Sequence, residues 1–463
     1  MPTHTGCISP PFTEPRCLMT DFNRYLPHTA EDIAAMLERC GARTLDDLYA
    51  DVPRELRLKK PYGIGKPMSE PELESLFRQI GALNKPMTCF AGAGFYHHYT
   101  PAAVGAICSR SEFATAYTPY QPEISQGTLQ YIFEYQSMMA ELTGMDASNA
   151  SVYDGATVTA EAMIMSVASA RKRNRVLISS TLSPAVAQVL STYAVPRGII
   201  LEVIPAHHGV TDRAELRAML GAGDVAGVIL QQPNYFGIIE DWENIADDIH
   251  AAKALMVVNA HASTLGVLRS PREWGADIAC GEAQSLGMPL NYGGPYLGYL
   301  CCRKALLRKL PGRIVGATTD ARGNRAFVLT LQAREQHIRR QKATSNICSN
   351  QGIMTLHAAV YLSLMGEAGL RKVNELSCCA AHALAKALAG TGRLALRYPE
   401  HPFLNEFVMD TVDPLTPQAI IDAAAAEGIL AGVPVGENGL MLAATEMCTP
   451  HDIERLTNIV SNL

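Results

Sequence analysis

The 463-residue sequence lacks an excess of positive charge. It carries 39 lysine and arginine residues against 45 aspartate and glutamate residues, which gives a net charge of -6 and a pI near 6.1. Nucleic-acid-binding proteins favour basic stripes, so this balance argues against a nucleic-acid partner. Long apolar runs are also absent, because none approaches the ~20 residues that are needed to cross a bilayer. These absences predict a soluble globular protein that engages neither nucleic acid nor a membrane.

Cysteine spacings that bind zinc or build a disulfide framework are missing. The 12 cysteines are spread from Cys7 to Cys448 without any Cys-x-x-Cys spacing, and only residues 301–302 and 378–379 form adjacent pairs. Neither arrangement suits common zinc motifs or disulfide frameworks. The first residues also lack the charged and apolar regions of a secretory signal. We therefore expect a cytoplasmic protein.

Motifs for three other common chemistries are missing as well. Residues 92–94 (Gly-Ala-Gly) lack the third glycine and the preceding strand of a dinucleotide-binding loop. No Gly-x-Ser-x-Gly elbow of an α/β-hydrolase occurs. The histidine pairs at 97–98 and 207–208 are adjacent, whereas helical metal ligands need a spacing of four residues. We therefore predict no metal site.

What is present divides the chain into three segments. Residues 1–90 are typical of an N-terminal arm of short helices, with capping boxes beginning at Thr29 and Ser69. Within the arm, residues 1–22 carry four prolines and no periodicity, as a disordered leader does, and Met19 is a second candidate start of translation. Residues 346–463 begin with a long helical stretch and continue as short strands and helices, which predicts a small C-terminal α+β domain.

The middle segment, residues 91–345, alternates apolar runs with helical stretches. This alternation predicts a large α/β domain whose mostly parallel sheet is covered by helices on both faces. The expected strands are residues 176–179, 200–204, 227–231, 256–260, 278–280 and 297–301. A large α/β domain followed by a small C-terminal domain is common among pyridoxal-phosphate (PLP) enzymes.

Residues 277–298 have the layout of the strand and loop that carry the Schiff-base lysine in many PLP enzymes, but they contain no lysine. The nearest lysines are Lys253 and Lys304, outside the stretch on either side. A Schiff base needs a primary amine, which neither Gln284 nor Ser285 can supply. We therefore expect that this chain does not anchor PLP itself.

Two further positions also indicate that this chain does not bind PLP. Asp154 is placed to cap the helix whose N-terminus would hold the cofactor phosphate, and its charge would repel that dianion. After strand 256–260, where such enzymes place an aspartate against the pyridine nitrogen, the chain has His261, which would not keep that nitrogen protonated. We interpret Asp154, His261, Gln284 and Ser285 as vestigial positions of a cofactor site.

The densest polar segment is the loop at residues 115–127. It combines two tyrosines, two glutamines and a glutamate with two prolines just before an expected helix. Loops on a rigid scaffold are where recognition concentrates, although a solvated connector with half-buried tyrosines is the alternative. Tyr96, Tyr99 and the histidine pair lie a little upstream and can join the same surface.

Five long and unusual stretches carry a family resemblance. They are residues 111–127, 141–146, 231–234, 293–298 and 339–348. They resemble the glycine-cleavage P-protein family, glycine dehydrogenase (decarboxylating), and more specifically the alpha-type subunit (subunit 1) of its split form, from about Arg24 to the C-terminus. The family commonly has aspartate where His97 stands and often where His261 stands, which weakens any claim that either residue is essential.

The resemblance implies a fold-type-I PLP-transferase-like structure and an α2β2 assembly with a lysine-bearing beta-type subunit. It implies that this partner holds PLP covalently, that glycine is decarboxylated, and that the aminomethyl group passes to the lipoyl arm of the H-protein. The resemblance and the polar density together select candidate residues that support the partner's site: Tyr117, Thr118, Tyr120, Gln121 and Glu123, then Tyr96 and His98.

Two alternatives stay open from the sequence. One is a self-contained PLP enzyme of the aminotransferase or cysteine-desulfurase type, which would use a lysine elsewhere in the chain. The other is a scaffold subunit that dimerises the partner and docks the H-protein without contributing to the chemistry.

Overall fold

The computed structural model describes residues 27–60, 63, 65, 67–170, 172–332, 336–343 and 345–463. The chain divides into two compact units, Met1–Asn84 and Lys85–Leu463. The expected leader at 1–22 and the candidate start at Met19 lie outside the described residues. Residues 85–90, which the sequence places in the arm, belong to the second unit.

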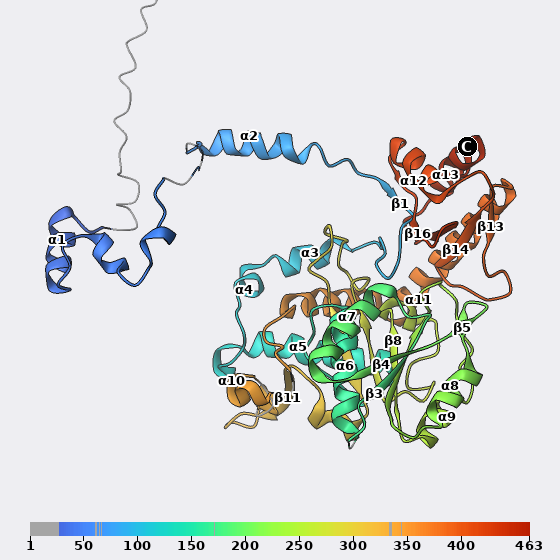
Figure 1. Cartoon of the computed structure of the whole chain (residues 1–463), viewed down its shortest axis with the longest axis horizontal. Coiled ribbons are helices and arrows are strands. Elements are labelled where there is room, and N and C mark those ends of the chain that lie inside the picture. The colour runs from blue at the N-terminus through green and yellow to red at the C-terminus, as the bar shows by residue number, and fades with distance from the viewer. Residues whose placement is uncertain are drawn as a thin grey trace, which may run out of the picture. The chain divides into compact units, whose positions relative to one another are not determined.

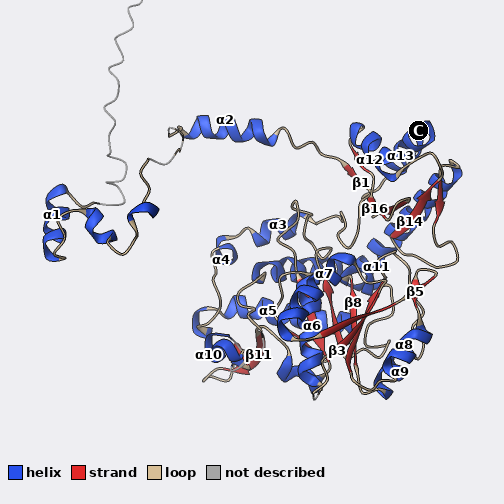
Figure 2. Ribbon diagram, in the orientation of Figure 1, coloured by secondary structure: helices blue, strands red, loops and turns tan. Residues whose placement is uncertain are grey.

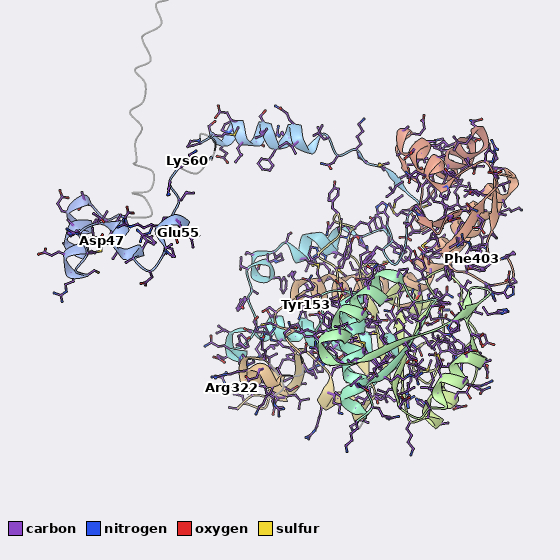
Figure 3. The ribbon with its side chains drawn as sticks, in the orientation of Figure 1. Asp47, Glu55, Lys60, Tyr153, Arg322 and Phe403 are labelled. Atoms are coloured by element: carbon purple, nitrogen blue, oxygen red, sulfur yellow. The ribbon has the colours of Figure 1, made fainter. Side chains whose placement is uncertain are left out.

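The described part of the first unit consists of short helices (Figure 1), as its pattern predicts. Helix α1 spans Ala30–Arg39 and α2 spans Glu70–Gly81, with 3-10 turns at Leu45–Tyr49 and Arg54–Leu56. Both predicted capping boxes form, at Thr29 and at Ser69. None of the residues in these four elements is buried, including the labelled Asp47 and Glu55 (Figure 3). Local capping therefore sets where α1 and α2 begin, although no described side chain of these elements is buried.

The second unit is built on a seven-stranded sheet in the order β2-β10-β9-β8-β7-β3-β4. Strands β4, β3, β7, β8 and β9 run parallel, whereas β10 is antiparallel to both β9 and β2. All six strands expected from the sequence are present. Their bounds, with that of β2, are β2 Ala147–Ser148, β3 Arg175–Ser179, β4 Ile200–Ile204, β7 Val225–Gln232, β8 Leu255–Ala260, β9 Ile278–Glu282 and β10 Gly298–Cys302.

Helices cover both faces of this sheet (Figure 2), because successive residues of a buried strand point to opposite sides. Met256 and Val258 pack in one core with α5 (Gln126–Thr143), α9 (Ile245–Ala251) and the first half of α11 (Gly352–Gly390). Val257, between them, packs in another core with α6 (Gly155–Ser169) and α7 (Pro184–Ala194). The predicted α/β layering is therefore confirmed.

Helix α11 links the sheet to the C-terminal part of the chain. It is interrupted at Gly366, whose φ of 57° lies in the left-handed region that favours glycine. By length and composition alone, α11 could cross a membrane. Its Leu356 and Tyr361, however, belong to a core of the sheet, and its Leu384 and Leu388 belong to the core of the C-terminal part. We therefore interpret α11 as a core helix.

The C-terminal part has its own apolar core and a four-stranded sheet in the order β13-β14-β17-β16 (orange to red in Figure 1). Strand β1 (Thr88–Cys89) pairs in parallel with β15 (Ile429–Leu430), so the chain enters the second unit beside this part. A domain boundary after residue 345 stays a prediction. The bounds here are β13 Leu394–Leu396, β14 Glu406–Thr411, α12 Pro417–Ala426, β16 Val433–Val435, β17 Gly439–Ala443 and α13 Pro450–Asn462.

Short elements complete the second unit and position the polar loop. The loop at 115–125 follows α4 and includes a 3-10 turn at Pro122–Ile124 before α5 begins. The other elements are α3 Ala102–Cys108, α4 Ser111–Ala114, β5 Ala206–His207, β6 Val210–Thr211, α8 Arg213–Leu220, β11 Ile314–Thr319, β12 Arg325–Thr330 and α10 Gln336–Arg339.

Candidate functional site

A cavity of about 160 Å³ lies where β7, β8 and β9 end and α6 begins. We call it the sheet-end cavity. Open α/β sheets place their ligand sites at this edge, because loops and helix N-termini converge there. Part of the lining comes from the C-terminal part of the chain. Its ionisable and amide side chains include Asp154, Gln231, Asn234, Asn259, His261, Glu282, Asn405 and Glu406.

Two carboxylates close the N-terminus of α6 at this cavity. Asp154, next to the labelled Tyr153 in Figure 3, is the N-cap as predicted, and its Oδ1 accepts from Thr157 N at 2.7 Å. The Oε2 atom of Glu282, at the end of β9, accepts from Gly155 N at 2.9 Å. Burial raises the pKa of Glu282 to about 8, although three backbone N–H groups donate to it. The amides that could hold a phosphate therefore face acidic side chains.

Gln284 connects the loop after β9 to the segment around Tyr96. Its Oε1 accepts from Tyr96 N at 3.0 Å, and its Nε2 donates to Tyr96 O at 3.1 Å and to Met288 O at 2.7 Å. The neighbouring Ser285 is buried, and its Oγ has no hydrogen-bond partner among the described residues. Of the two residues in the lysine-free loop, Gln284 thus joins two segments of backbone through its amide, and Ser285 is buried beside it.

His261 lines the cavity as an uncharged ring. Desolvation, helped by the nearby His98, lowers the pKa of His261 to about 3. Neither of its ring nitrogens has a hydrogen-bond partner within the described part of the chain. The ring of Tyr96 packs edge-on against it, with 4.6 Å between ring centroids. A neutral imidazole cannot supply the negative charge that stabilises a protonated pyridine nitrogen.

Tyr96 and His98 fasten one backbone segment to the C-terminal part. The Tyr96 hydroxyl donates to Glu406 Oε2 at 2.9 Å, and Ala93 N donates to Glu406 Oε1 at 2.5 Å. His98 Nδ1 lies 2.8 Å from Glu446 Oε2. Burial raises the pKa of Glu406 to about 7. Both candidate residues are buried, and their hydrogen bonds connect residues 93–99 to the C-terminal part.

PLP does not fit the sheet-end cavity. No lysine lines it in the described ranges of the chain, so the anchoring amine is missing. Asp154 and Glu282 occupy the helix N-terminus, and His261 supplies no negative charge. The geometry therefore does not favour a self-contained PLP enzyme.

The polar loop borders a second cavity of about 420 Å³, which we call the loop cavity. Tyr117 and Thr118 line it, and Thr118 Oγ1 hydrogen-bonds with Ser349 Oγ. Arg313 Nη2 donates to the Tyr120 hydroxyl at 2.9 Å, and the guanidinium lies 5.2 Å from the centre of that ring. Gln121 and Glu123 are exposed and line neither cavity. Of the seven candidate residues, Tyr96 therefore lines the sheet-end cavity and Tyr117 and Thr118 line the loop cavity, whereas the other four line neither.

Sequence reasoning did not select several residues that shape these cavities. Glu282 had a readable signal, because it is a carboxylate at the end of an apolar strand, two residues before Gln284. Asn405 and Glu406 had none, since they reach the sheet-end cavity from a distant part of the chain. Arg313 also lacked a signal, although Cys348 ends one of the family-like stretches beside it.

Glu161 of α6 supports one wall of the loop cavity. Ser345 Oγ donates to Glu161 Oε1 at 2.9 Å, which holds the start of the segment that carries Cys348, Ser349 and Asn350. Its other oxygen, Oε2, is buried without a hydrogen-bond partner in the described part of the chain. This desolvation raises the pKa of Glu161 from 4.5 to about 7.

We expect Glu161→Gln to stabilise the protein at alkaline pH far more than at acid pH. The pKa of Glu161 is higher in the folded protein than in the unfolded chain, so binding of its proton stabilises the folded state. This stabilisation is complete below pH 4.5 and is lost as pH rises through about 7. The amide still accepts from Ser345 and does not ionise. Urea unfolding should give a gain about 2 to 3 kcal/mol larger at about pH 8.5 than at about pH 5.

Glu454→Gln, at an exposed position of α13, is the matched control and should show no such dependence. An equal gain in the free energy of unfolding for Glu161→Gln at both pH values would contradict the assignment of Glu161 as a buried carboxyl that binds a proton.

Three comparisons place the chain among known proteins. The family described as glycine cleavage system P-protein matches residues 23–460. A relative from Moorella thermoacetica, named probable glycine dehydrogenase (decarboxylating) subunit 1, is 47% identical over 438 residues, covering 93% of this chain and 98% of the relative. A crystal structure of glycine decarboxylase (P-protein) of the glycine cleavage system, in inhibitor-bound form, has a TM-score of 0.86 at 42% identity, covering 94% of this chain and 99% of that one.

A more distant structure shows the fold alone. It is a C-DES variant with glycine covalently linked to its PLP cofactor, with a TM-score of 0.60 at 15% identity, covering 83% of this chain and 99% of that one. The predicted fold-type-I PLP-transferase-like class is confirmed by these structural matches. Since the family match extends over nearly the whole chain and the relatives are covered almost completely, the chain belongs to the glycine cleavage system P-protein family.

Proposed function

We propose that this chain is the subunit of a glycine dehydrogenase (decarboxylating) that does not anchor PLP. The observation that carries the proposal is the sheet-end cavity, which has the fold of a PLP enzyme around it but no lysine and an acidic helix N-terminus. A lysine-bearing beta-type subunit of the same family would hold PLP covalently and supply its electron-accepting chemistry. Together they decarboxylate glycine and pass the aminomethyl group to the lipoyl arm of the H-protein.

We further propose an α2β2 assembly in the cytoplasm. The term subunit 1 in the name of the Moorella relative supports a second subunit. The spacing of the cysteines in the sequence supports a reducing compartment, as does the finding that no disulfide bond joins the ten cysteines in the described part of the chain.

In this proposal, the polar loop is what the chain contributes to the partner's site. Tyr117 is 76% exposed and Tyr120 is 42% exposed, so neither side chain belongs to the hydrophobic core. A hydrogen bond from Arg313 holds the Tyr120 hydroxyl in position, and a hydrogen bond with Ser349 holds the Thr118 hydroxyl. Gln121 and Glu123 extend the same exposed surface. Such pre-positioned donors and acceptors can orient a substrate and exclude water in another chain's site.

Tyr96 and His98 have a different role in the proposal. Both are buried and bonded to acidic residues, Glu406 and Glu446. They are therefore positioning residues that keep segment 93–99 in place, and they do not contact glycine.

Borohydride reduction in the presence of PLP tests where the cofactor is anchored. We expect a stoichiometric pyridoxyl-lysine peptide from the beta-type subunit and none from this chain, whether the subunits are reduced alone or as a complex. Glycine decarboxylation, measured by exchange of the carboxyl carbon with labelled bicarbonate, should require both subunits. A stoichiometric pyridoxyl-lysine in this chain, or full exchange by the beta-type subunit alone, would overturn the proposal.

A further inference from the structure

The sheet-end cavity contains buried polar groups that the chain leaves without partners. Asn405, directly before β14, is only 6% exposed and lines the cavity, and its side-chain amide forms no hydrogen bond within the described residues. Both ring nitrogens of His261 are also unbonded among the described residues. Leaving buried polar groups unpaired costs free energy, so such groups in a cavity indicate an occupant.

Other groups in the wall have hydrogen-bonding capacity to spare. Gln231 uses its Oε1 to accept from Ser183 N, and Asn259 uses its Nδ2 to donate to Thr159. Asp154 accepts from Thr157 through Oδ1, and its Oδ2 forms no hydrogen bond or ion pair in the described part of the chain. A few convergent polar groups in a concave, largely apolar cavity are typical of a small-molecule site.

The charges around the cavity decide which sign of ligand it accepts. Asp154, Glu282 and Glu406 contribute carboxyl groups, and neither lysine nor arginine lines the cavity in the described ranges. His261 is neutral and adds no positive charge. An anion would be opposed by Asp154 and by the lack of any positive side chain. Burial raises the pKa of Glu282 to about 8 and that of Glu406 to about 7, so these two groups lose their protons most readily when a cation lies beside them.

We propose that the sheet-end cavity binds a small organic cation, an amidinium or primary ammonium compound without an acidic group. Asn405 would orient the ligand by accepting a hydrogen bond through its side-chain oxygen. Asp154 would supply the countercharge, joined by Glu282 and Glu406 once the bound cation has displaced their protons. The volume of about 160 Å³ admits a compact molecule of this kind. The binding needs neither the partner subunit nor PLP, so it goes beyond the proposed function.

Acetamidinium, acetamide and acetate provide the test, because they have nearly the same shape and differ in charge. Each is titrated into the full-length chain alone by isothermal titration calorimetry. We expect acetamidinium to bind at least about tenfold more tightly than acetamide, since an amidinium forms charge-assisted hydrogen bonds to carboxylates. Acetate should show no saturable binding. Equal affinities for the three probes, or no binding of acetamidinium, would overturn the proposal.

Two variants locate the binding. Asn405→Leu removes the unpaired amide and should weaken acetamidinium binding at least about tenfold. Asp154→Asn keeps a good N-cap residue and removes one charge, so it should weaken binding even if Asn405→Leu fails to fold. Asn438→Leu, at an exposed position, is the matched control and should bind as the unchanged chain does. Unchanged affinity in either folded cavity variant would place the ligand elsewhere and overturn the proposal.

This experiment is independent of the glycine dehydrogenase assignment. It uses the isolated chain and measures no turnover, whereas that assignment depends on borohydride reduction and carbon exchange. A negative result for cation binding therefore does not affect the glycine dehydrogenase assignment, and a negative result for that assignment does not affect the proposed cation site.

Discussion

Gln284→Lys will not convert this chain into a protein that anchors PLP. After incubation with PLP and reduction with borohydride, peptide mapping should show no more pyridoxylation at position 284 than at the exposed Lys253. The phosphate of PLP would still meet the acidic side chains of Asp154 and Glu282, which accept the N–H groups at the N-terminus of α6. The neutral His261 would still leave a pyridine nitrogen without a countercharge.

The same variant carries a structural penalty. A lysine can donate to Tyr96 O and Met288 O, but it cannot accept the hydrogen bond that Tyr96 N now gives to Gln284 Oε1. Leaving that buried N–H unpaired costs about 1 to 3 kcal/mol, which thermal unfolding will show. Gln284→Glu is a useful comparison, because it keeps an acceptor and supplies no amine.

One result with this variant would contradict the exclusion of PLP. Stoichiometric pyridoxylation at position 284 in the single variant would show that the acidic groups do not exclude PLP. We expect that adding Asp154→Ser and Glu282→Gln to Gln284→Lys raises the labelling of position 284 above that of Lys253.

The largest effect on turnover is expected from changing the polar loop at two positions. Tyr120→Phe combined with Glu123→Gln should lower kcat of the reconstituted enzyme by about 100-fold, if the loop orients groups at the partner's site. The change removes one hydroxyl and one charge from exposed or half-exposed positions and leaves the loop backbone and the ring of Tyr120 in place. Glycine turnover with saturating partner subunit and H-protein is the measurement.

A role in chemistry and a role in assembly predict different readouts for this double variant. A scaffold role would leave kcat unchanged once the complex is saturated, and that result would contradict the assignment of the loop. Tyr49→Phe with Glu55→Gln is the matched control, because it makes the same two changes on exposed residues of the first unit. Analytical ultracentrifugation should show the same assembly for both variants, so that a loss of kcat can be assigned to the loop.

Much of the fold could be predicted because its causes are local. Thr29, Ser69 and Asp154 cap their helices through contacts with residues three positions away. Apolar runs such as residues 255–260 are buried on both sides, which is the pattern of a parallel strand between helices. The absence of lysine from residues 277–298 is likewise visible in the sequence without a structure. These features depend on residue type and spacing along the chain.

The grouping of the candidate residues could not be predicted in the same way. The sequence placed Tyr96 and His98 with Tyr117 and Tyr120 on one surface, whereas the structure places the first pair beside the sheet-end cavity and the second beside the loop cavity. Nearness in sequence was a poor guide, because helices α3 and α4 separate the two segments.

By itself, the sequence determined the layered α/β architecture, the family, and the inability of this chain to form a Schiff base in the usual loop. Only the tertiary structure decided what replaces the lost site. The Tyr96 hydroxyl meets Glu406 across 310 positions of the chain, and Gln284 meets Tyr96 across 188. Such contacts leave no periodic pattern in either segment, because they are selected by the packing of two parts of the fold. The acidic, amide-lined character of the sheet-end cavity therefore exists only in the folded chain.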